Sequence, residues 1–268
     1  MAQPKIRKCE KANGKDGNHS LSPALCWTGG KTRLKNRLVQ NIPEHKVYIE
    51  PFIGGGSIFW KKPLVEKNVI NDKNSELIWF YRNLRDTNCA KLQHCNLPTN
   101  ASEFKGAVGN RKKSVCAFLG VNKRSYACQM DKPRFNLSKS QGKNPKKAGI
   151  ENLNKSCNKY QEKLRKTKIL NEDFKSVVQK HDSKDAFIYM DPPYVDTYAY
   201  GQEAVSPEEV CKLAKRVKGK VMLSYNDHPR VRKACKGLRM KQIETNYEIQ
   251  KAITGKGKTV KELIITNY

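Results

Sequence analysis

Hydrophobic positions along the chain fall into two patterns, which predict strands and helices in turn. Short apolar runs have the length and composition of buried strands, and they lie at residues 46–50, 69–72, 168–170, 186–190, 220–225 and 260–268. Between several of these runs, apolar residues recur at every third or fourth position, which is the spacing of an amphipathic helix. This alternation predicts an α/β fold with a Rossmann-like, doubly wound sheet, whose last strand lies at the sheet edge.

The chain divides into four parts by composition. Residues 1–24 are rich in Lys, Asn and Gly and predict a flexible basic arm. Residues 25–86 and 166–268 carry the expected strands and form one sheet domain. In residues 87–165 the strands thin out while Lys and Arg accumulate, which predicts a mainly helical insertion.

The net charge indicates the class of partner. Lys and Arg number 53 against 25 acidic residues, which gives a formal charge of +28, and the excess is spread along the whole sequence. A field of this sign attracts a polyanion, and nucleic acid is the commonest one. No apolar run reaches the ~18 residues of a membrane span, and the first residues lack the apolar centre of a signal peptide. We therefore expect no membrane partner and no secretion.

The cysteines give no sign of a metal site. The nine cysteines contain no Cys-x-x-Cys pair, and their number is odd. In a chain without a secretion signal this favours free thiols. We expect no zinc and no disulfide, with Cys211 and Cys235 as small buried residues on helices.

The expected strand 186–190 ends in Asp191-Pro192-Pro193-Tyr194. In an open α/β sheet, ligands bind beyond the carboxyl ends of the strands. Two consecutive prolines cannot continue a strand ladder, so they present the Asp191 carboxylate, the Pro192 carbonyl and the Tyr194 ring as a stiff unit. Two acceptors and a flat ring suit a planar base that carries an amino group. The tetrapeptide alone is equally consistent with a strand end followed by an ordinary turn.

A second strand end carries a glycine-rich turn. Residues 46–50 are followed by Pro51-Phe52-Ile53-Gly54-Gly55-Gly56 and a helix from about Ile58. Strand, glycine turn and helix form the first half of a nucleotide-binding unit. Phe59 stands where a dinucleotide fingerprint requires its third glycine, which disfavours a nicotinamide oxidoreductase. Asp72 ends the next strand at the interval expected of a ribose acceptor, with a helix N-cap as the alternative.

These motifs, in this order, resemble the Dam-type adenine-specific DNA methyltransferases. The stretches that carry the resemblance are Trp27-Thr28-Gly29-Gly30-Lys31, residues 50–57, Asn71-Asp72, Asp173-Phe174, Asp191-Pro192-Pro193-Tyr194, residues 221–224 and residues 261–264. The match covers both ends of the chain and is weak between residues 85 and 165. It implies a site-specific methyltransferase that transfers a methyl group from S-adenosylmethionine to the 6-amino group of adenine in double-stranded DNA, by base flipping and without a metal.

The resemblance also implies roles for individual residues. Asp191, Pro192, Pro193 and Tyr194 form the catalytic turn. The methyl donor is contacted by Trp27, Lys31, Phe52, Gly54, Gly56, Asp72, Asp173, Phe174 and Asp191. Residues 25–86 then form the donor-binding part of the catalytic domain, 87–165 the target-recognition insertion, and 166–268 the remainder.

The insertion is the expected DNA-reading part, since basic side chains suit phosphates and Asn, Gln, Ser and Arg suit base edges. The DNA contacts expected on the chain are Lys123, Arg124, Tyr126, Lys256 and Lys258. Arg124 is the residue expected to read a base. The family's Asn-Gly-rich hairpin is shortened here, so the target sequence GATC is only what the family suggests. A solvated, lysine-rich helical insertion is the alternative.

Three further functions remain open from the sequence. One is a basic nucleic-acid-binding protein with a degenerate donor site, and the others are methyl transfer to the cytosine amino group or to RNA. The chain is expected to act in the cytoplasm or wherever the DNA resides. Whether a restriction endonuclease with the same target site accompanies it is also left open.

Overall fold

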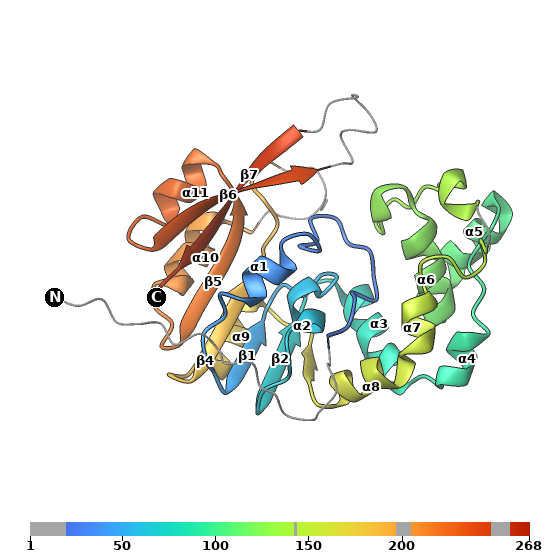
Figure 1. Ribbon diagram of the computed structural model, residues 1–268, viewed down its shortest axis with the longest axis horizontal. Helices are drawn as coiled ribbons and strands as arrows, with labels where there is room; N and C mark the ends of the chain where they lie inside the picture. The colour runs from blue at the N-terminus through green and yellow to red at the C-terminus, as the bar shows by residue number, and fades with distance from the viewer. Residues whose placement is uncertain (1–19, 142–143, 197–204, 248–257) are drawn as a thin grey trace.

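The computed structural model describes residues 20–141, 144–196, 205–247 and 258–268 (Figure 1). It contains one seven-stranded sheet in the order β3-β2-β1-β4-β5-β7-β6. The strands are Val47–Glu50 (β1), Lys67–Asn71 (β2), Lys168–Leu170 (β3), Ala186–Met190 (β4), Lys220–Asn226 (β5), Arg239–Tyr247 (β6) and Lys258–Thr266 (β7). The first five pair in parallel, whereas β7 runs antiparallel to both of its neighbours. The α/β doubly wound sheet expected from the sequence is confirmed.

Helices cover both faces of the sheet, which explains why its central strands are apolar throughout. All five residues of β4 are buried. The sheet helices are Lys35–Val39 (α1), Ser57–Lys61 (α2), Ser75–Asp86 (α3), Phe174–His181 (α9), Pro207–Ala214 (α10) and Pro229–Ala234 (α11). Side chains of α1, α2 and α3 form one hydrophobic core with the sheet, and side chains of α9, α10 and α11 form a second.

The position of the last strand differs from the expectation. Strand β7 lies between β5 and β6, so β6 is the edge strand instead. The sequence gives little sign of β6 because charged and polar residues, among them Arg239, Lys241 and Glu244, interrupt its apolar positions. Polar side chains are usual on an edge strand, where they discourage pairing with other chains.

The insertion is helical, as its sequence predicts, and lies at one end of the sheet (Figure 1). Its helices are Cys89–Gln93 (α4), Ala101–Asn110 (α5), Val115–Arg124 (α6), Glu151–Lys155 (α7) and Cys157–Arg165 (α8), with short 3-10 turns at Tyr126–Cys128 (η1) and Leu137–Ser140 (η2). We call residues 87–165 the helical lobe. Its core is continuous with that of the sheet, since the Phe118 ring of α6 stacks on Phe80 of α3 with a centroid separation of 4.7 Å.

The last residues of the expected basic arm are folded. Residues 1–19 lie outside the described part, but Leu21 and Ala24 are buried in the core. The Leu21 N–H donates to the Trp60 carbonyl at 2.9 Å, and the Tyr160 hydroxyl donates to the Ser22 carbonyl at 2.7 Å. Residues 21–24 therefore belong to the folded domain.

The expectation of free thiols is wrong for every cysteine in the described residues. The disulfides are Cys26–Cys128, Cys89–Cys157, Cys95–Cys116 and Cys211–Cys235. Cys9 lies outside the described residues. Two pairs lie within the helical lobe, and the pair with the largest sequence separation, 102 residues, joins the lobe to the segment before Trp27. Sequence spacing did not reveal these pairs because the fold brings together cysteines that are far apart along the chain.

Candidate active site

The Asp191 turn and the glycine turn lie at the same edge of the sheet. Strands β1 and β4 are parallel neighbours, with Ile49 opposite Ile188. The chain order reverses between these two strands, because β2 and β3 lie beyond β1 while β5 lies beyond β4. This is the switch point at which open α/β sheets bind their ligands. The structure therefore brings together the two motifs that the sequence singled out.

Lys31 joins the first motif to the Asp191 turn. Its ammonium lies 2.7 Å from Asp191 Oδ1 and 2.9 Å from Oδ2, and it also donates to the Gly29 carbonyl at 2.8 Å. The same ammonium lies 4.6 Å from the centre of the Tyr194 ring. Lys31 is only 3% exposed, whereas Asp191 and Tyr194 are partly exposed, so a buried cation holds a carboxylate and a ring that remain accessible at the end of β4.

Burial sets the acidity of Asp191. It raises the pKa of Asp191 to about 6; the neighbouring Lys31 ammonium opposes this rise, and the Glu262 carboxylate adds to it. A second acid, Glu50, is buried at the end of β1, where burial raises its pKa to about 8 despite a hydrogen bond from the Tyr48 hydroxyl. Asp191 therefore ionises at lower pH than Glu50, and near neutral pH it is the carboxylate that pairs with Lys31.

We expect kcat/KM to fall as the pH drops through about 6, because protonated Asp191 loses an acceptor for an amino group. Removing the charge with Lys31→Met removes an interaction that lowers the pKa of Asp191, so the midpoint should move to higher pH. Lys31→Arg keeps the charge and serves as the control. The test is to measure kcat/KM of the unchanged protein and of both variants between about pH 5 and 8, a range that brackets the midpoint. If the midpoint of Lys31→Met equals that of the unchanged protein, the assignment of this midpoint to Asp191 is contradicted.

Trp27 lies directly on the glycine turn. Gly54 has φ +45°, and a Cβ there would lie 2.8 Å from the Trp27 ring; one at Gly55 would lie 2.9 Å from Trp27 Cβ. Gly56 has φ +69°. Positive φ and close approach of the ring both require glycine. The sequence motif is thus explained by local geometry, in which the Trp27 indole packs on the backbone of the glycine turn.

Asp72 is tied to the same turn. Its Oδ2 accepts the Gly54 N–H at 3.0 Å, and its Oδ1 accepts the Asn74 N–H at 2.9 Å. Burial raises its pKa, and these backbone hydrogen bonds oppose the rise. The N-cap of α3 is Asn74, whose side chain accepts from Leu77 N. Asp72 is therefore not the helix cap, and its carboxylate keeps acceptor capacity for a ligand hydroxyl.

Asp173 and Phe174 lie at the start of α9. The Asp173 side chain caps the helix by accepting the Lys175 N–H at 2.9 Å. The Phe174 ring is buried and lies 5.0 Å from the Phe52 ring, measured between centroids. These two rings join the glycine turn to the end of β3, so every donor residue expected from the sequence lies at the carboxyl edge of the sheet.

The segment before Trp27 is fixed to the helical lobe by contacts that the sequence did not indicate. The Asn122 side chain accepts the Cys26 N–H at 2.9 Å and donates to the Cys26 carbonyl at 2.7 Å. The Thr28 hydroxyl donates to the Ala127 carbonyl at 3.3 Å. Together with the Cys26–Cys128 disulfide, these bonds couple the donor motif to the lobe.

The residues expected to contact DNA differ in their exposure, and one of them is not described by the structure. Tyr126 is 49% exposed, whereas Lys123 is half-buried and burial lowers its pKa to about 8. Lys256 lies outside the described residues, and Lys258 is described only as the first residue of β7, opposite Tyr247.

Arg124 does not lie where a base-reading residue must be. It is 2% exposed, and its guanidinium donates to the carbonyls of Pro98 (3.1 Å), Ala148 (3.2 Å) and Pro145. These bonds tie α6 to two distant segments of the lobe. This placement supports a structural role for Arg124. The sequence had instead predicted that Arg124 reads a base.

We expect Arg124→Ala to lower the free energy of unfolding by about 3 kcal/mol, because it leaves buried carbonyls without a donor. The exposed Arg134, ten positions further along the same lobe, is the matched control and should change stability by less than about 0.5 kcal/mol. Urea unfolding of both variants makes the comparison. Equal stability of the two would contradict the structural role.

The described residues give two negative findings. No helix among them is long and apolar enough to cross a membrane. Within the same residues, no group of three or more His, Cys, Asp or Glu side chains is gathered as a metal site.

Comparison with known proteins agrees with this geometry. The family model for D12 class N6 adenine-specific DNA methyltransferases matches residues 27–113 and 122–249. The chain is 31% identical to the type II methyltransferase M1.LlaDCHI of Lactococcus lactis subsp. cremoris, over 93% of this chain and 96% of that protein. It is 24% identical to the type II methyltransferase M.CviBI of Paramecium bursaria Chlorella virus NC1A, over 92% of this chain and 100% of that protein. It is also 24% identical to a DNA adenine methylase of Vibrio cholerae, over 90% of this chain and 94% of that protein. The protein therefore belongs to the D12 class of N6 adenine-specific DNA methyltransferases and is a site-specific adenine methyltransferase.

Proposed function

We propose that the chain methylates the 6-amino group of an adenine that is flipped out of duplex DNA onto the Asp191 turn. The observation that carries this proposal is the contact of the Lys31 ammonium with both the Asp191 carboxylate and the Tyr194 ring at the switch point of the sheet. The Asp191 carboxylate and the Pro192 carbonyl accept the two N–H groups of the amine. The Tyr194 ring stacks on the base, whose eversion is required because the duplex hides the amino group.

The residues around the glycine turn fit S-adenosylmethionine. Trp27 and the backbone of Gly54 offer an apolar wall, and Asp72 offers acceptors for the ribose hydroxyls. Phe52 and Phe174 cover the adenine ring of the donor, with Asp173 beside them. Lys31 supplies a cation for the donor carboxylate. When bound, the donor supplies an electrophilic methyl group on a sulfonium.

The chain accelerates the reaction by position and charge. The amino nitrogen is a weak nucleophile because its lone pair is delocalised into the ring. Hydrogen bonds to Asp191 and Pro192 would favour a tetrahedral nitrogen, whose lone pair would form the new bond to the methyl carbon as the carbon–sulfur bond breaks and the thioether leaves. The nitrogen would pass its displaced proton to the Asp191 carboxylate, which already accepts that N–H. Preorganised acceptors and orientation together account for the acceleration, and no covalent enzyme intermediate is needed.

The DNA-reading surface that we propose is the segment after α6. Ser125 pairs with Phe135 in an antiparallel bridge, and the Tyr126 N–H donates to the Arg134 carbonyl at 2.8 Å, so residues 125–135 form a short hairpin. Tyr126, Lys132 and Arg134 are exposed on it. A ring and two cations suit stacking and phosphate contacts. This hairpin replaces Arg124 as the proposed reading element.

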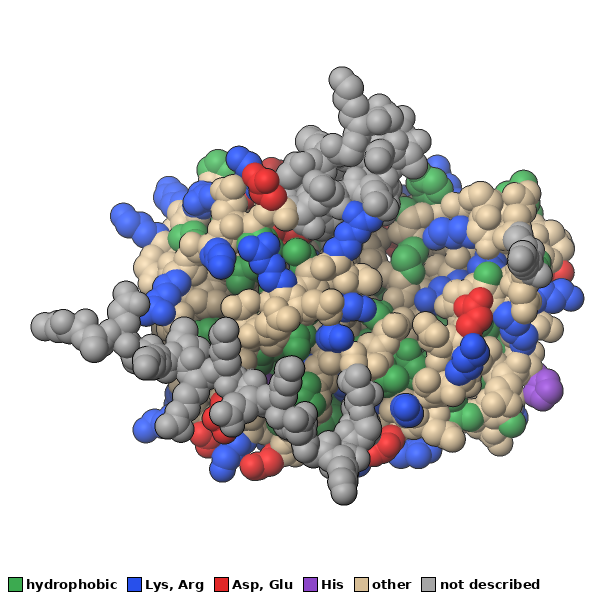
Figure 2. All heavy atoms as spheres, in the orientation of Figure 1, with side chains coloured by type: hydrophobic (Ala, Val, Ile, Leu, Met, Phe, Trp, Pro, Cys, Tyr) green, Lys and Arg blue, Asp and Glu red, His purple; other side chains and the backbone are tan. Residues whose placement is uncertain are grey.

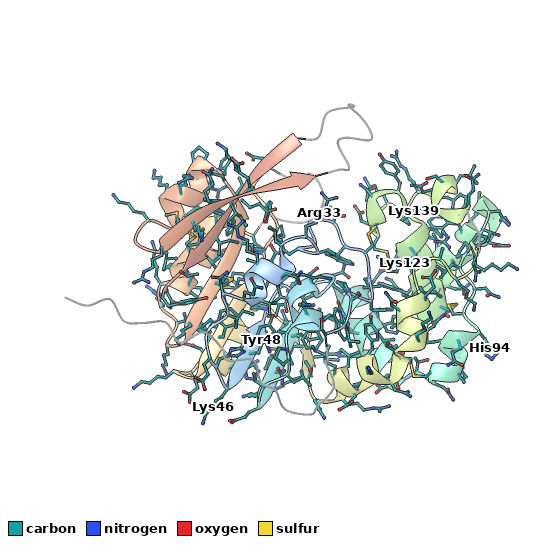
Figure 3. All side chains as sticks on the ribbon, viewed as in Figure 1. Arg33, Lys46, Tyr48, His94, Lys123 and Lys139 are labelled. Atoms are coloured by element: carbon teal, nitrogen blue, oxygen red, sulfur yellow. A yellow bond between two sulfur atoms is a disulfide. The ribbon has the colours of Figure 1, made fainter. Side chains whose placement is uncertain are left out.

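Positive charge extends beyond the hairpin. Lys and Arg side chains are spread over both the sheet and the helical lobe on the face shown in Figure 2, with fewer acidic side chains among them. Figure 3 shows Arg33 on the sheet side, and Lys123 and Lys139 on the lobe side, of the boundary between the two parts. We propose that the duplex lies across this boundary, so that the hairpin and the Asp191 turn reach the same DNA.

The test is methylation of unmodified duplex DNA with isotopically labelled S-adenosylmethionine, followed by nucleoside analysis of the product. The proposal predicts labelled N6-methyladenine, and sequencing of the same DNA reads out the target sequence, for which GATC is the family-based candidate. Labelled N4-methylcytosine, or label in RNA alone, would contradict it. Absence of saturable donor binding would favour a nucleic-acid-binding protein with a degenerate donor site.

The cellular setting remains a proposal. The chain is expected to act wherever its DNA resides, and the four disulfides among the described residues require that these cysteine pairs stay oxidised there. A restriction endonuclease with the same target site is a proposed partner, which is supported by the type II names of two relatives. Cleavage of unmethylated but not methylated DNA by an extract of the source cells would test it.

A further inference from the structure

Two side chains besides Lys31 hold the Asp191–Tyr194 turn and the residue after it in place. Its consecutive prolines supply no N–H, so the hydrogen bonds that fix this region come from elsewhere. The Tyr194 hydroxyl donates to Glu262 Oε2 at 2.8 Å. Asn226 holds both backbone groups of Val195: its Oδ1 accepts the N–H at 3.2 Å, and its Nδ2 donates to the carbonyl at 3.1 Å.

One strand pair presents both side chains. Asn226 ends β5 and lies directly opposite Glu262 of β7 in the antiparallel register. Strand β5 is in turn the parallel neighbour of β4, which leads into the turn. The antiparallel strand thus places an acceptor for Tyr194 next to the amide that holds Val195. We call Asn226 and Glu262 the cross-strand clamp.

The burial of Glu262 supports a positional role. Its side chain is fully buried, as are the apolar neighbours Leu263 and Ile265 on the same strand. Burying a carboxylate costs free energy of folding, and a well-packed apolar side chain in its place is often equally or more stabilising. The acceptor that Glu262 provides for the Tyr194 hydroxyl gives a reason for a carboxylate at this position.

We propose that Glu262 and Asn226 are positioning residues, which set the Tyr194 ring and the Asp191 carboxylate for methyl transfer. The inference rests on the proposed role of the Asp191 turn. Because the Lys31 ammonium contacts both the ring and the carboxylate, a shift of Tyr194 disturbs the whole unit. Neither clamp residue is assigned a contact with base or donor; both act through the turn.

A double-mutant cycle tests the first contact. Tyr194→Phe keeps the ring but removes the hydroxyl, and Glu262→Leu removes its acceptor. We expect each to lower kcat about tenfold, and the double variant to be no slower than either single one, since both remove one interaction. Glu262→Gln keeps an oxygen acceptor and should recover most of the rate. Additive losses, or no loss in either single variant, would overturn the role of Glu262.

The second contact has a matched control at the other end of β5. Asn267 likewise makes one backbone bond through each amide atom, although to two different residues: its Oδ1 accepts the Val221 N–H at 2.9 Å, and its Nδ2 donates to the Gly219 carbonyl at 3.0 Å. Both Asn→Ala changes should lower the melting temperature by similar amounts. Only Asn226→Ala should lower kcat, by about tenfold, with the donor KM changed less than about twofold.

These outcomes separate the clamp from the proposed function. Equal kcat for the two asparagine variants would overturn the positioning role of Asn226, whether or not Glu262→Leu folds. If Asp191→Ala is inactive while the clamp variants are fully active, only the clamp fails. If Asp191→Ala retains full activity, the proposed role of the turn fails as well.

Discussion

Replacement of Asp191 by alanine is expected to lower kcat at least about 10³-fold, because the preorganised acceptor for the adenine amine is lost. The affinity for S-adenosylmethionine should change by only a few-fold, since most of the proposed donor contacts lie on the glycine turn and on the segment that contains Trp27. Labelled methyl transfer and calorimetric donor binding measure the two effects separately.

Two further variants make this result specific. Asp191→Ala leaves the buried Lys31 without its carboxylate, so Asp191→Asn, which keeps an oxygen acceptor for the ammonium, tests whether loss of activity merely follows loss of folding. Asp185→Ala, at the exposed start of the same strand region, should leave kcat unchanged. Full activity of Asp191→Ala would exclude the turn from catalysis.

Reduction of the disulfides is expected to have the largest effect on stability. In the chain-entropy account, a crosslink that closes a loop of about 100 residues contributes about 4.7 kcal/mol, and Cys26–Cys128 spans 102 residues. This alone is comparable to the total stability of many domains, about 5–15 kcal/mol. We therefore expect the oxidised protein to unfold at markedly higher urea concentration than the protein in dithiothreitol.

One crosslink should also affect activity. Cys26–Cys128 ties the segment before Trp27 to the lobe that carries the proposed DNA-reading hairpin. The double variant Cys26→Ala/Cys128→Ala should lose donor and DNA affinity as well as stability. The control is Cys211→Ala/Cys235→Ala, which removes the disulfide that joins α10 to the residue after α11 on the other face of the sheet. This control should lose stability only. An oxidised protein no more stable than the reduced one would contradict the structural role of the crosslinks.

The central part of the fold could be read from the sequence because local and global signals agree there. The apolar run of β4 is followed by prolines that must end it, and the glycine turn requires positive φ at Gly54 and Gly56. Such signals act within a few residues, so pattern alone places both motifs at strand ends. Parallel pairing then brings those ends together at one edge of the sheet.

The features that the sequence did not indicate depend on contacts between distant segments. The cysteine pairs, the cross-strand clamp and the burial of Arg124 involve residues whose partners are decided by the complete fold. Arg124 illustrates this clearly. Its side chain type suits a phosphate or a base edge as well as it suits buried carbonyls, and only the packing of the lobe selects among them.

The most direct test of the account is a crystal structure with S-adenosylmethionine bound. The account predicts the donor against Trp27 and Gly54, its ribose on Asp72, and its sulfonium methyl directed at the space in front of the Asp191 carboxylate and the Pro192 carbonyl. A donor bound elsewhere, or a methyl group directed away from Asp191, would contradict it.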